Sequence, residues 1–204
     1  MISENGLMSV GEVGGKRERT RALLLLSSAQ QFAKHGYNGV SIDLLAKAAK
    51  LSKGALYDHF KSKEDIYIQS TSHYLVSVLK TIKPSDVEKG LNAEQALFLY
   101  LGKFLELLHN DWVARRLVLR VITESTGENV QAIARKVLTE PFEYTASLLS
   151  AFRPELDAEE HLFSFYCNAI LREDFKGVIG ALSPNVGALT DSDALLDHFR
   201  KVWA

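Results

Sequence analysis

Between Ser41 and Phe60 the apolar positions follow two short helical patterns separated by a tight turn. Ser41 is a favourable N-cap for the first pattern, and Ser52 is one for the second. In the second pattern Leu56 and Phe60 lie four residues apart, so they face the same way and leave the opposite face to small, basic and aromatic residues. This arrangement predicts a helix-turn-helix over 41–60.

The rest of the chain shows helical periodicity behind capping residues, with no internal repeat. The pattern Leu162–Tyr166 alternates like a strand, but it is short and lies inside a long capped segment, so a helix is expected there. Pro141 is expected to kink or divide the helix that contains it. The chain is therefore predicted to be all-α, with helices near 62–83, 92–110, 111–126, 128–151, 157–182 and 191–203.

The outer face of the second short helix has the character of a surface that enters a major groove. Gly54 and Ala55 have little or no side chain, so the backbone could approach base edges closely. Asp58 is an acid on this face, which repels phosphate but could accept a hydrogen bond from a cytosine amino group. The side chains expected to reach flanking phosphates are Lys53, Tyr57, His59 and Lys63.

Residues 52–64 read Ser-Lys-Gly-Ala-Leu-Tyr-Asp-His-Phe-Lys-Ser-Lys-Glu, which resembles the recognition helix and following turn of the tetracycline-repressor (TetR) family. The resemblance covers roughly residues 18–66. One departure is Lys50, at a turn position where the family usually has Gly, and a left-handed lysine there would cost about 1 kcal/mol. Upstream, the family's first helix and its terminating glycine are matched by Thr20-Arg21, Leu24-Leu25, Ala29, Phe32 and Gly36-Tyr37.

The resemblance implies a DNA-binding transcriptional regulator, most typically a ligand-responsive repressor that binds a palindromic operator as a homodimer. It implies a three-helix DNA-binding domain at 18–78 and a larger ligand-binding and dimerisation domain at 79–204. The glycine-rich start of the chain has little periodicity, which predicts a disordered arm at 1–17. A helical protein-interaction module that keeps the helix-turn-helix shape without binding an operator is the alternative. The residues implied in DNA binding are Ser41, Lys53, Gly54, Ala55, Tyr57, Asp58, His59 and Lys63.

Two further residue sets follow for the C-terminal part. Aromatic residues concentrate there together with arginines, which favours a pocket for a small apolar or aromatic effector of unknown identity. Arg116, Arg120 and Glu124 are spaced four apart, so they could equally form a solvated ladder of ion pairs. The ligand-binding candidates are Tyr100, Phe104, Trp112, Arg116, Arg120, Phe142, Phe163 and Tyr166. The candidates for the dimer interface are Leu162, Phe165, Leu195, Leu196 and Phe199.

The charge distribution supports a DNA-binding N-terminal part. Residues 1–62 hold nine Lys and Arg against five Asp and Glu, whereas the remainder holds 15 against 20. The hydrophobic content of 47% suits a globular core, and the chain has neither a long apolar run nor a signal-peptide pattern, so a cytoplasmic protein is expected. The sequence contains none of the catalytic or nucleotide-binding motifs that were sought, so we expect that the protein is not an enzyme and needs no cofactor.

Cysteine and histidine usage gives little sign of metal or redox chemistry. The single Cys167 excludes an internal disulfide, and its apolar helix favours a core residue over a redox sensor. Asp157, Glu160 and His161 could offer metal ligands on one helix. A helix cap and a partly exposed histidine explain the same three residues, so no metal site is predicted.

Overall fold

The computed structural model describes residues 15–83, 90–123, 128–182 and 191–204. Within these ranges every element of regular secondary structure is a helix, which confirms the all-α prediction. The elements are α1 (Lys16–Gly39), α2 (Ile42–Ala48), α3 (Lys53–Tyr57), α4 (Lys63–Leu79), the 3-10 helix η3 (Lys80–Ile82), α5 (Ala93–Asn110), α6 (Trp112–Thr123), α7 (Glu128–Phe152), α8 (Ala158–Leu182) and α9 (Ser192–Val202).

The observed helices lie close to their predicted positions, with two qualifications. α7 continues through Pro141, so the chain does not divide there although proline removes one intrahelical hydrogen bond. The N-terminal arm predicted at 1–17 falls largely on residues 1–14, which lie outside the described residues. The segment Leu162–Tyr166 is part of α8, as its long capped context indicated.

The chain forms two compact units, and each unit consists of two separate segments of the sequence. The first unit contains the chain up to Ser77 together with Arg116–Lys136, and the second contains Val78–Arg115 and Val137–Ala204. The predicted boundary near residue 78 did not include the return of 116–136 to the first unit. α6 and α7 consequently contribute residues to both units.

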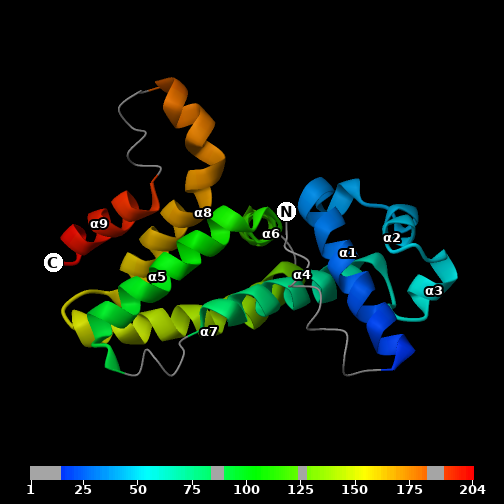
Figure 1. Cartoon of the computed structure of the whole chain (residues 1–204), viewed down its shortest axis with the longest axis horizontal. Helices are drawn as coiled ribbons and strands as arrows, with labels where there is room; N and C mark the ends of the chain where they lie inside the picture. Colours follow the sequence, from blue (N-terminus) through cyan, green and yellow to red (C-terminus); the bar gives the residue numbers. More distant parts are fainter. Residues whose placement is uncertain (1–14, 84–89, 124–127, 183–190) are drawn as a thin grey trace. The chain divides into compact units, whose positions relative to one another are not determined.

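The first unit is built around α1, with α2 packed against α1 and α3 packed against α2 (Figure 1). Leu24, Ala29 and Phe32 lie fully buried on one side of α1, at the spacing that a single helical face requires. The helical segment at the end of α1 is interrupted at Gly36, whose φ of 71° is in the left-handed region. This kink directs the chain into the helix-turn-helix.

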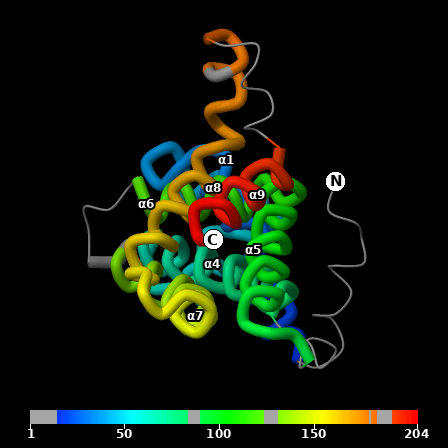
Figure 2. The backbone as a smooth tube through the Cα atoms, turned by 90° about the vertical axis from the view of Figure 1, so that its left-hand side faces the viewer, coloured from blue at the N-terminus to red at the C-terminus, as the bar shows by residue number. Residues whose placement is uncertain are grey.

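In the second unit α5 packs against both α8 and α9. α5 begins with a reciprocal capping box, in which the Asn92 side chain accepts from the Gln95 N–H at 2.9 Å and the Gln95 side chain accepts from the Asn92 N–H at 3.1 Å. Figure 2 looks along α5 and α7, with α8 and α9 beside them. The core includes Leu97 and Leu101 of α5, Phe165 of α8 and Trp203, each fully buried.

The second half of α8 differs from the rest of this unit, because it rises clear of α5 and α7 in both views (Figures 1 and 2). Its apolar side chains are correspondingly exposed, and they include Phe175, Val178 and Leu182. No helix in the described ranges combines the length and the apolar character needed to cross a membrane.

Candidate functional site

Serine side chains cap both helices of the helix-turn-helix. Ser41 Oγ accepts a hydrogen bond from the Leu44 N–H at 3.1 Å, and Ser52 Oγ accepts one from the Ala55 N–H at 3.2 Å. Each bond satisfies an amide group that has no partner in the first turn of its helix. The helix starts predicted at these two serines are confirmed.

The turn between α2 and α3 is closed by Lys50 in a left-handed conformation, with φ 56°. The Leu51 N–H donates to the Ala46 carbonyl at 2.9 Å, the bond that ends a helix in a Schellman motif. This is the conformation expected at a position where glycine would be free of strain. The residue type is unfavourable here, but the turn geometry is retained.

α3 has one buried and one exposed face. Leu56 and Phe60 are buried, whereas the Tyr57 side chain is 52% exposed. A Cβ placed at Gly54 would meet no atom nearer than Ser52 Oγ at 3.8 Å, so packing within the chain does not require glycine at this position. The outer surface of α3 therefore has no side chain at Gly54 and free space above it, which would allow the helix backbone to approach a duplex closely.

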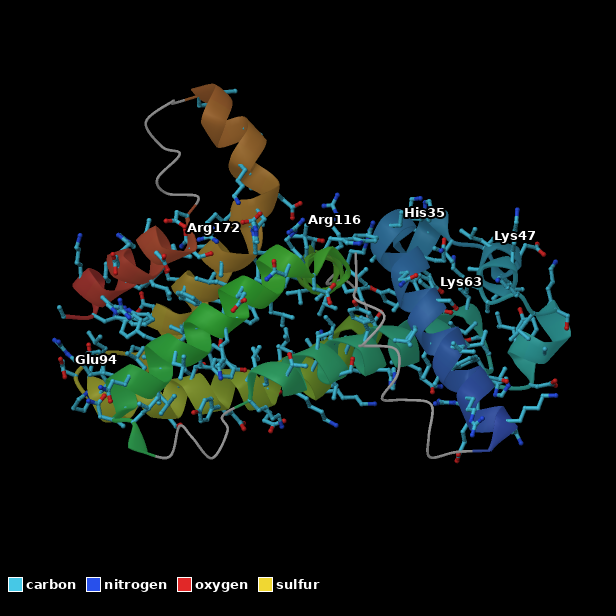
Figure 3. All side chains as sticks on the ribbon, in the orientation of Figure 1. His35, Lys47, Lys63, Glu94, Arg116 and Arg172 are labelled. Atoms are coloured by element: carbon cyan, nitrogen blue, oxygen red, sulfur yellow. The ribbon has the colours of Figure 1, made fainter. Side chains whose placement is uncertain are left out.

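Two lysines assigned to phosphates from the sequence have neighbours in the structure. Lys53 Nζ lies 2.7 Å from Asp43 Oδ1, which joins the first residue of α3 to the first turn of α2. Lys63 Nζ lies 4.3 Å from the centre of the Tyr37 ring, which is a cation–π geometry. Figure 3 labels Lys63 at the start of α4 and Lys47 on α2.

The far end of α3 is held by the start of α1. Arg17 Nη2 donates to the Asp58 carbonyl oxygen at 3.3 Å, so a cation lies at the C-terminus of α3, where the helix dipole favours it. His59 is half-buried, with its ring centre 6.4 Å from that of Phe60. The sequence did not predict the Arg17 contact, because it joins residues 41 positions apart.

A second long-range contact links α6 to the end of α1 within the first unit. The Arg120 guanidinium lies against Gly36, where an added Cβ would fall 2.5 Å from Nη1. Arg120 Nε also donates to the Ala33 carbonyl at 3.4 Å. Gly36 is thus needed both for its positive φ and for the close approach of Arg120.

The interior of the second unit brings together four of the eight ligand-binding candidates, Tyr100, Phe104, Phe142 and Tyr166. The Tyr166 ring lies 5.1 Å from that of Phe104 in a T-shaped arrangement and 6.2 Å from that of Phe142. Burial raises the pKa of Tyr166 to about 12, while a hydrogen bond with Thr145 at 3.1 Å acts in the opposite direction. Burial also raises the pKa of Tyr100. This interior contains neutral hydroxyls among aromatic rings.

The N-terminal part of the chain is similar to a known family of proteins. Residues 24–69 match the sequence model of bacterial regulatory proteins of the tetR family, a range that contains the whole helix-turn-helix. Over these residues the chain is similar to regulators of the TetR family. The match covers the DNA-binding part that the resemblance had indicated.

Two relatives extend the comparison beyond the TetR-family motif. The HTH-type transcriptional activator FasR of Mycolicibacterium smegmatis is 25% identical over 102 residues, which are 50% of this chain and 46% of FasR. The fatty acid metabolism regulator protein of Bacillus subtilis is 28% identical over 127 residues, which are 60% of this chain and 65% of that protein. The chain thus spans less than two thirds of either relative.

Two solved structures share the fold over most of the chain. AibR, in complex with isovaleryl coenzyme A and operator DNA, has a TM-score of 0.62 at 20% identity, covering 74% of this chain and 84% of AibR. FadR from Bacillus subtilis, in complex with stearoyl-CoA, has a TM-score of 0.65 at 18% identity, covering 87% of this chain and 96% of FadR. At these identities the likeness shows the TetR-type fold.

The other ligand-binding candidates lie outside the aromatic interior. Trp112 is 45% exposed and Phe163 is 67% exposed, so neither ring packs among the tyrosines. Arg116 is exposed, and Arg120 contacts Gly36 in the first unit. Glu124, the third member of the possible charge ladder, lies outside the described residues.

The five residues predicted for a dimer interface are buried within this chain. Leu162 and Phe165 have no exposed surface, and Leu195, Leu196 and Phe199 are each less than a tenth exposed. Large apolar residues on α8 and α9 were expected to meet a partner, but these five pack in the chain's own core. The exposed apolar side chains on the second half of α8 include Leu171, Phe175, Val178 and Leu182.

A buried charge cluster in the second unit was missed by the sequence. Glu173 is 9% exposed, and its carboxylate lies 2.6 Å from Lys176 Nζ and 3.6 Å from His109 Nδ1. Burial alone would raise the pKa of Glu173, but Lys176 and His109 hold it below its ordinary value. Arg172, labelled in Figure 3, donates to the Asp191 carbonyl at 3.0 Å and so fastens α8 to the start of α9.

Metal-ligating side chains do not gather anywhere in the described ranges, where no three His, Cys, Asp or Glu residues form a potential metal site. Asp157 Oδ1 instead accepts from the Glu159 and Glu160 N–H groups, each at 3.1 Å, as a helix cap does. His161 Nδ1 accepts from Trp203 Nε1 at 3.1 Å. Each of these side chains has a structural role.

Proposed function

We propose that this chain is a DNA-binding transcriptional regulator, acting as a ligand-responsive repressor on a palindromic operator. The observation that carries the proposal is the exposed face of α3 inside a TetR-family helix-turn-helix. Packing within the chain does not require glycine at position 54, and Tyr57 of the same helix is exposed. A helical protein-interaction module would not require this combination.

The regulator acts as a homodimer, because one short recognition helix supplies too few base contacts for useful specificity. The second half of α8 supports this. Its exposed apolar residues at 171, 175, 178 and 182 fall within an arc of roughly 60° on the helix surface. A groove of about 540 Å³ between α8 and α9 continues this stripe and includes Leu171 and Phe175.

The effector binds in the interior of the second unit, against the rings of Tyr100, Phe104, Phe142 and Tyr166. A neutral, apolar interior with a few hydroxyl groups suits an aliphatic or aromatic ligand whose polar part is small or lies outside. AibR and FadR hold acyl-CoA molecules, which makes acyl-CoA thioesters the first ligands to examine. Binding releases the operator only if the ligand prefers one arrangement of the protein.

The proposed regulator works in the cytoplasm and has no catalytic activity. Both curated relatives described above are named as regulators of transcription or metabolism, and neither is named as an enzyme. The enzyme motifs sought in the sequence are absent.

The decisive experiment is selection of bound sequences from random duplex DNA by the purified chain. A palindromic consensus is expected, with two half-sites separated by about one helical turn. If no consensus is recovered, operator binding is contradicted and the helical protein-interaction module becomes the favoured function. Placed over a promoter, the recovered operator should reduce transcription in vitro when the protein is added.

The dimer is tested by light scattering on Phe175→Asp, which places a charge in the exposed α8 stripe. The wild-type chain should have twice the mass of the variant at micromolar concentration, because the charge must be desolvated in a packed interface. Leu23→Asp is the matched control, since Leu23 is 58% exposed in the first unit and should leave the mass unchanged. A monomeric wild-type chain would exclude the dimer.

The effector site is tested by thermal unfolding with isovaleryl-CoA, stearoyl-CoA and free coenzyme A, with operator release measured in parallel. A ligand at 100 times its Kd should stabilise the chain by about 2.7 kcal/mol. Phe104→Ala should abolish that shift for the same ligand. Stabilisation by free coenzyme A alone would place binding outside the aromatic interior.

A further inference from the structure

The ion pair between Lys53 and Asp43 lies at the most exposed part of the helix-turn-helix. Lys53 Nζ is 2.7 Å from Asp43 Oδ1, and their side chains are 58% and 72% exposed. Lys53 is the first residue of α3, and Asp43 is in the first turn of α2. The pair therefore joins the N-terminal ends of the two helices that meet DNA in a helix-turn-helix.

The two residues have different relations to the helix dipoles. A carboxylate in the first turn of α2 is favourable, whereas an ammonium group at the first position of α3 is not. Asp43 supplies the negative charge that makes the position of Lys53 tolerable. With Asp43 in place, the pair carries no net charge.

The neutral pair alters what Lys53 can contribute to DNA binding. A lysine that reaches a phosphate releases about one counterion and adds about 0.9 to the slope of log affinity against log salt. If Lys53 left Asp43 for a phosphate, the Asp43 carboxylate would face the same polyanion uncompensated. The gain of one contact is then offset by the repulsion of one acid.

Lys63 provides an internal contrast on the same surface. Its ammonium group lies over the neutral ring of Tyr37, so its charge remains available to a phosphate. Two lysines that look equivalent in the sequence therefore differ in their electrostatic surroundings. One has a carboxylate partner at hydrogen-bond distance and the other has an aromatic ring.

We propose that Asp43 holds Lys53 away from the phosphate backbone and so restrains sequence-independent binding to DNA. Asp43 is on this view a specificity-determining residue, since regulation depends on the ratio of operator affinity to affinity for all other sequences. The inference rests on the proposed DNA-binding function. It replaces the expectation that Lys53 neutralises a phosphate.

The experiment measures affinity for an unrelated duplex and for the selected operator as a function of salt. The proteins are wild type, Asp43→Asn, Lys53→Met, the double variant and Lys63→Met. On the unrelated duplex, Asp43→Asn should steepen the salt slope by about 0.9 and raise the affinity about fivefold at 0.15 M salt. The operator should gain less, because base contacts already fix the position of α3.

The remaining variants identify the group responsible. The double variant should match the wild-type slope, because it replaces a neutral pair by two neutral side chains and so cancels the gain of Asp43→Asn. Lys63→Met should lower the slope by about 0.9 in either background. Glu106→Gln, which removes an exposed acid from the second unit, controls for overall charge and should change nothing.

Three results would overturn the inference. One is a lower slope for the double variant than for the wild-type chain, because Lys53 would then contact a phosphate despite Asp43. Another is an unchanged slope for Asp43→Asn. The third is a loss of operator affinity in Asp43→Asn without any gain on unrelated DNA, which would mean that the pair only orients α3.

Urea denaturation shows whether each variant is folded, and Asp43→Ser repeats the test if Asp43→Asn folds poorly. Failure of the regulator function is distinguishable as well. It would appear as the absence of a selected operator for the wild-type chain, whereas the measurements on the unrelated duplex would still report on Asp43 and Lys53.

Discussion

The recognition helix α3 exposes its polar side chains, whereas the interior of the second unit buries polar side chains. Lys53 and Tyr57 of α3 lie at the surface. The local contacts there are the ion pair of Lys53 with Asp43 and the cap that Ser52 forms on α3. The second unit buries Tyr166 beside Thr145 and places Glu173 between Lys176 of the same helix and His109 of α5. Substitutions in the first region should therefore change binding, and those in the second should change stability.

The largest effect is expected from Gly54→Leu. The added side chain would extend into the space that the duplex must enter, so operator binding should fall by about a thousandfold or more, to the level of sequence-independent binding. The free energy of unfolding should stay within about 0.5 kcal/mol, as for other exposed positions. Titration of labelled operator and urea denaturation measure the two quantities.

Ser164→Leu is the control for this prediction, because it adds the same side chain to an exposed position of α8 and should leave operator binding intact. Unchanged operator affinity in Gly54→Leu would show that α3 does not enter the groove.

The next effect belongs to the second unit. Phe165→Ala removes a fully buried ring that contacts Tyr166, Phe199 and Trp203, so the free energy of unfolding should fall by about 3–5 kcal/mol. Phe163→Ala, only two residues away, removes a ring that is 67% exposed and should change stability by less than about 0.5 kcal/mol. Urea denaturation measures both. Equal losses would place Phe163 in a buried contact.

Glu173→Gln should lower the free energy of unfolding by about 1–3 kcal/mol at pH 7, because it leaves Lys176 and His109 without their carboxylate. The pKa of Glu173 is lowered in the folded chain, so its stabilisation is complete above the ordinary glutamate pKa of about 4.3. That stabilisation is lost as the pH falls through the lower, folded value.

The difference between wild type and Glu173→Gln in urea denaturation should therefore shrink between pH 5 and pH 3. A difference that stays constant over this range would show that the charge of Glu173 does not matter.

The smallest effect is expected at the turn of the helix-turn-helix. Lys50→Gly should stabilise the chain by about 0.5–1 kcal/mol, because glycine adopts a φ of 56° without the steric cost that a side chain brings. Lys50→Ala keeps a Cβ and should bring no such gain, as thermal unfolding would show. A gain in both variants would trace the effect to the lysine charge instead of the backbone.

The contrast between the two regions also explains what the sequence could predict. The caps at Ser41 and Ser52, and the left-handed turn at Lys50, depend on residues no more than five positions apart. Such signals are local, so the helix-turn-helix and its outward face were predictable. The family resemblance rested on this segment and on the first helix before it, over roughly residues 18–66.

Contacts between segments far apart in the sequence could not be predicted from such local signals. The pairing of Lys53 with Asp43 could not be predicted, because nothing in the sequence gives the angle at which α2 brings Asp43 to it. Glu173 gave no signal, since its partner His109 lies on another helix. Phe165 and Phe163 are both large and apolar, and α8 carries such residues on several sides, so periodicity alone could not separate core from surface.

The contact between Arg120 and Gly36 bears on the engineering of hybrid regulators. Exchanging DNA-binding heads as one contiguous cassette ending near residue 78 would separate α1 from the arginine that contacts its end. Leu117, Val121 and Ile133, which are buried and belong to the same unit, would be lost with it. A functional graft of this head must carry residues 116–136 as a second, discontinuous piece.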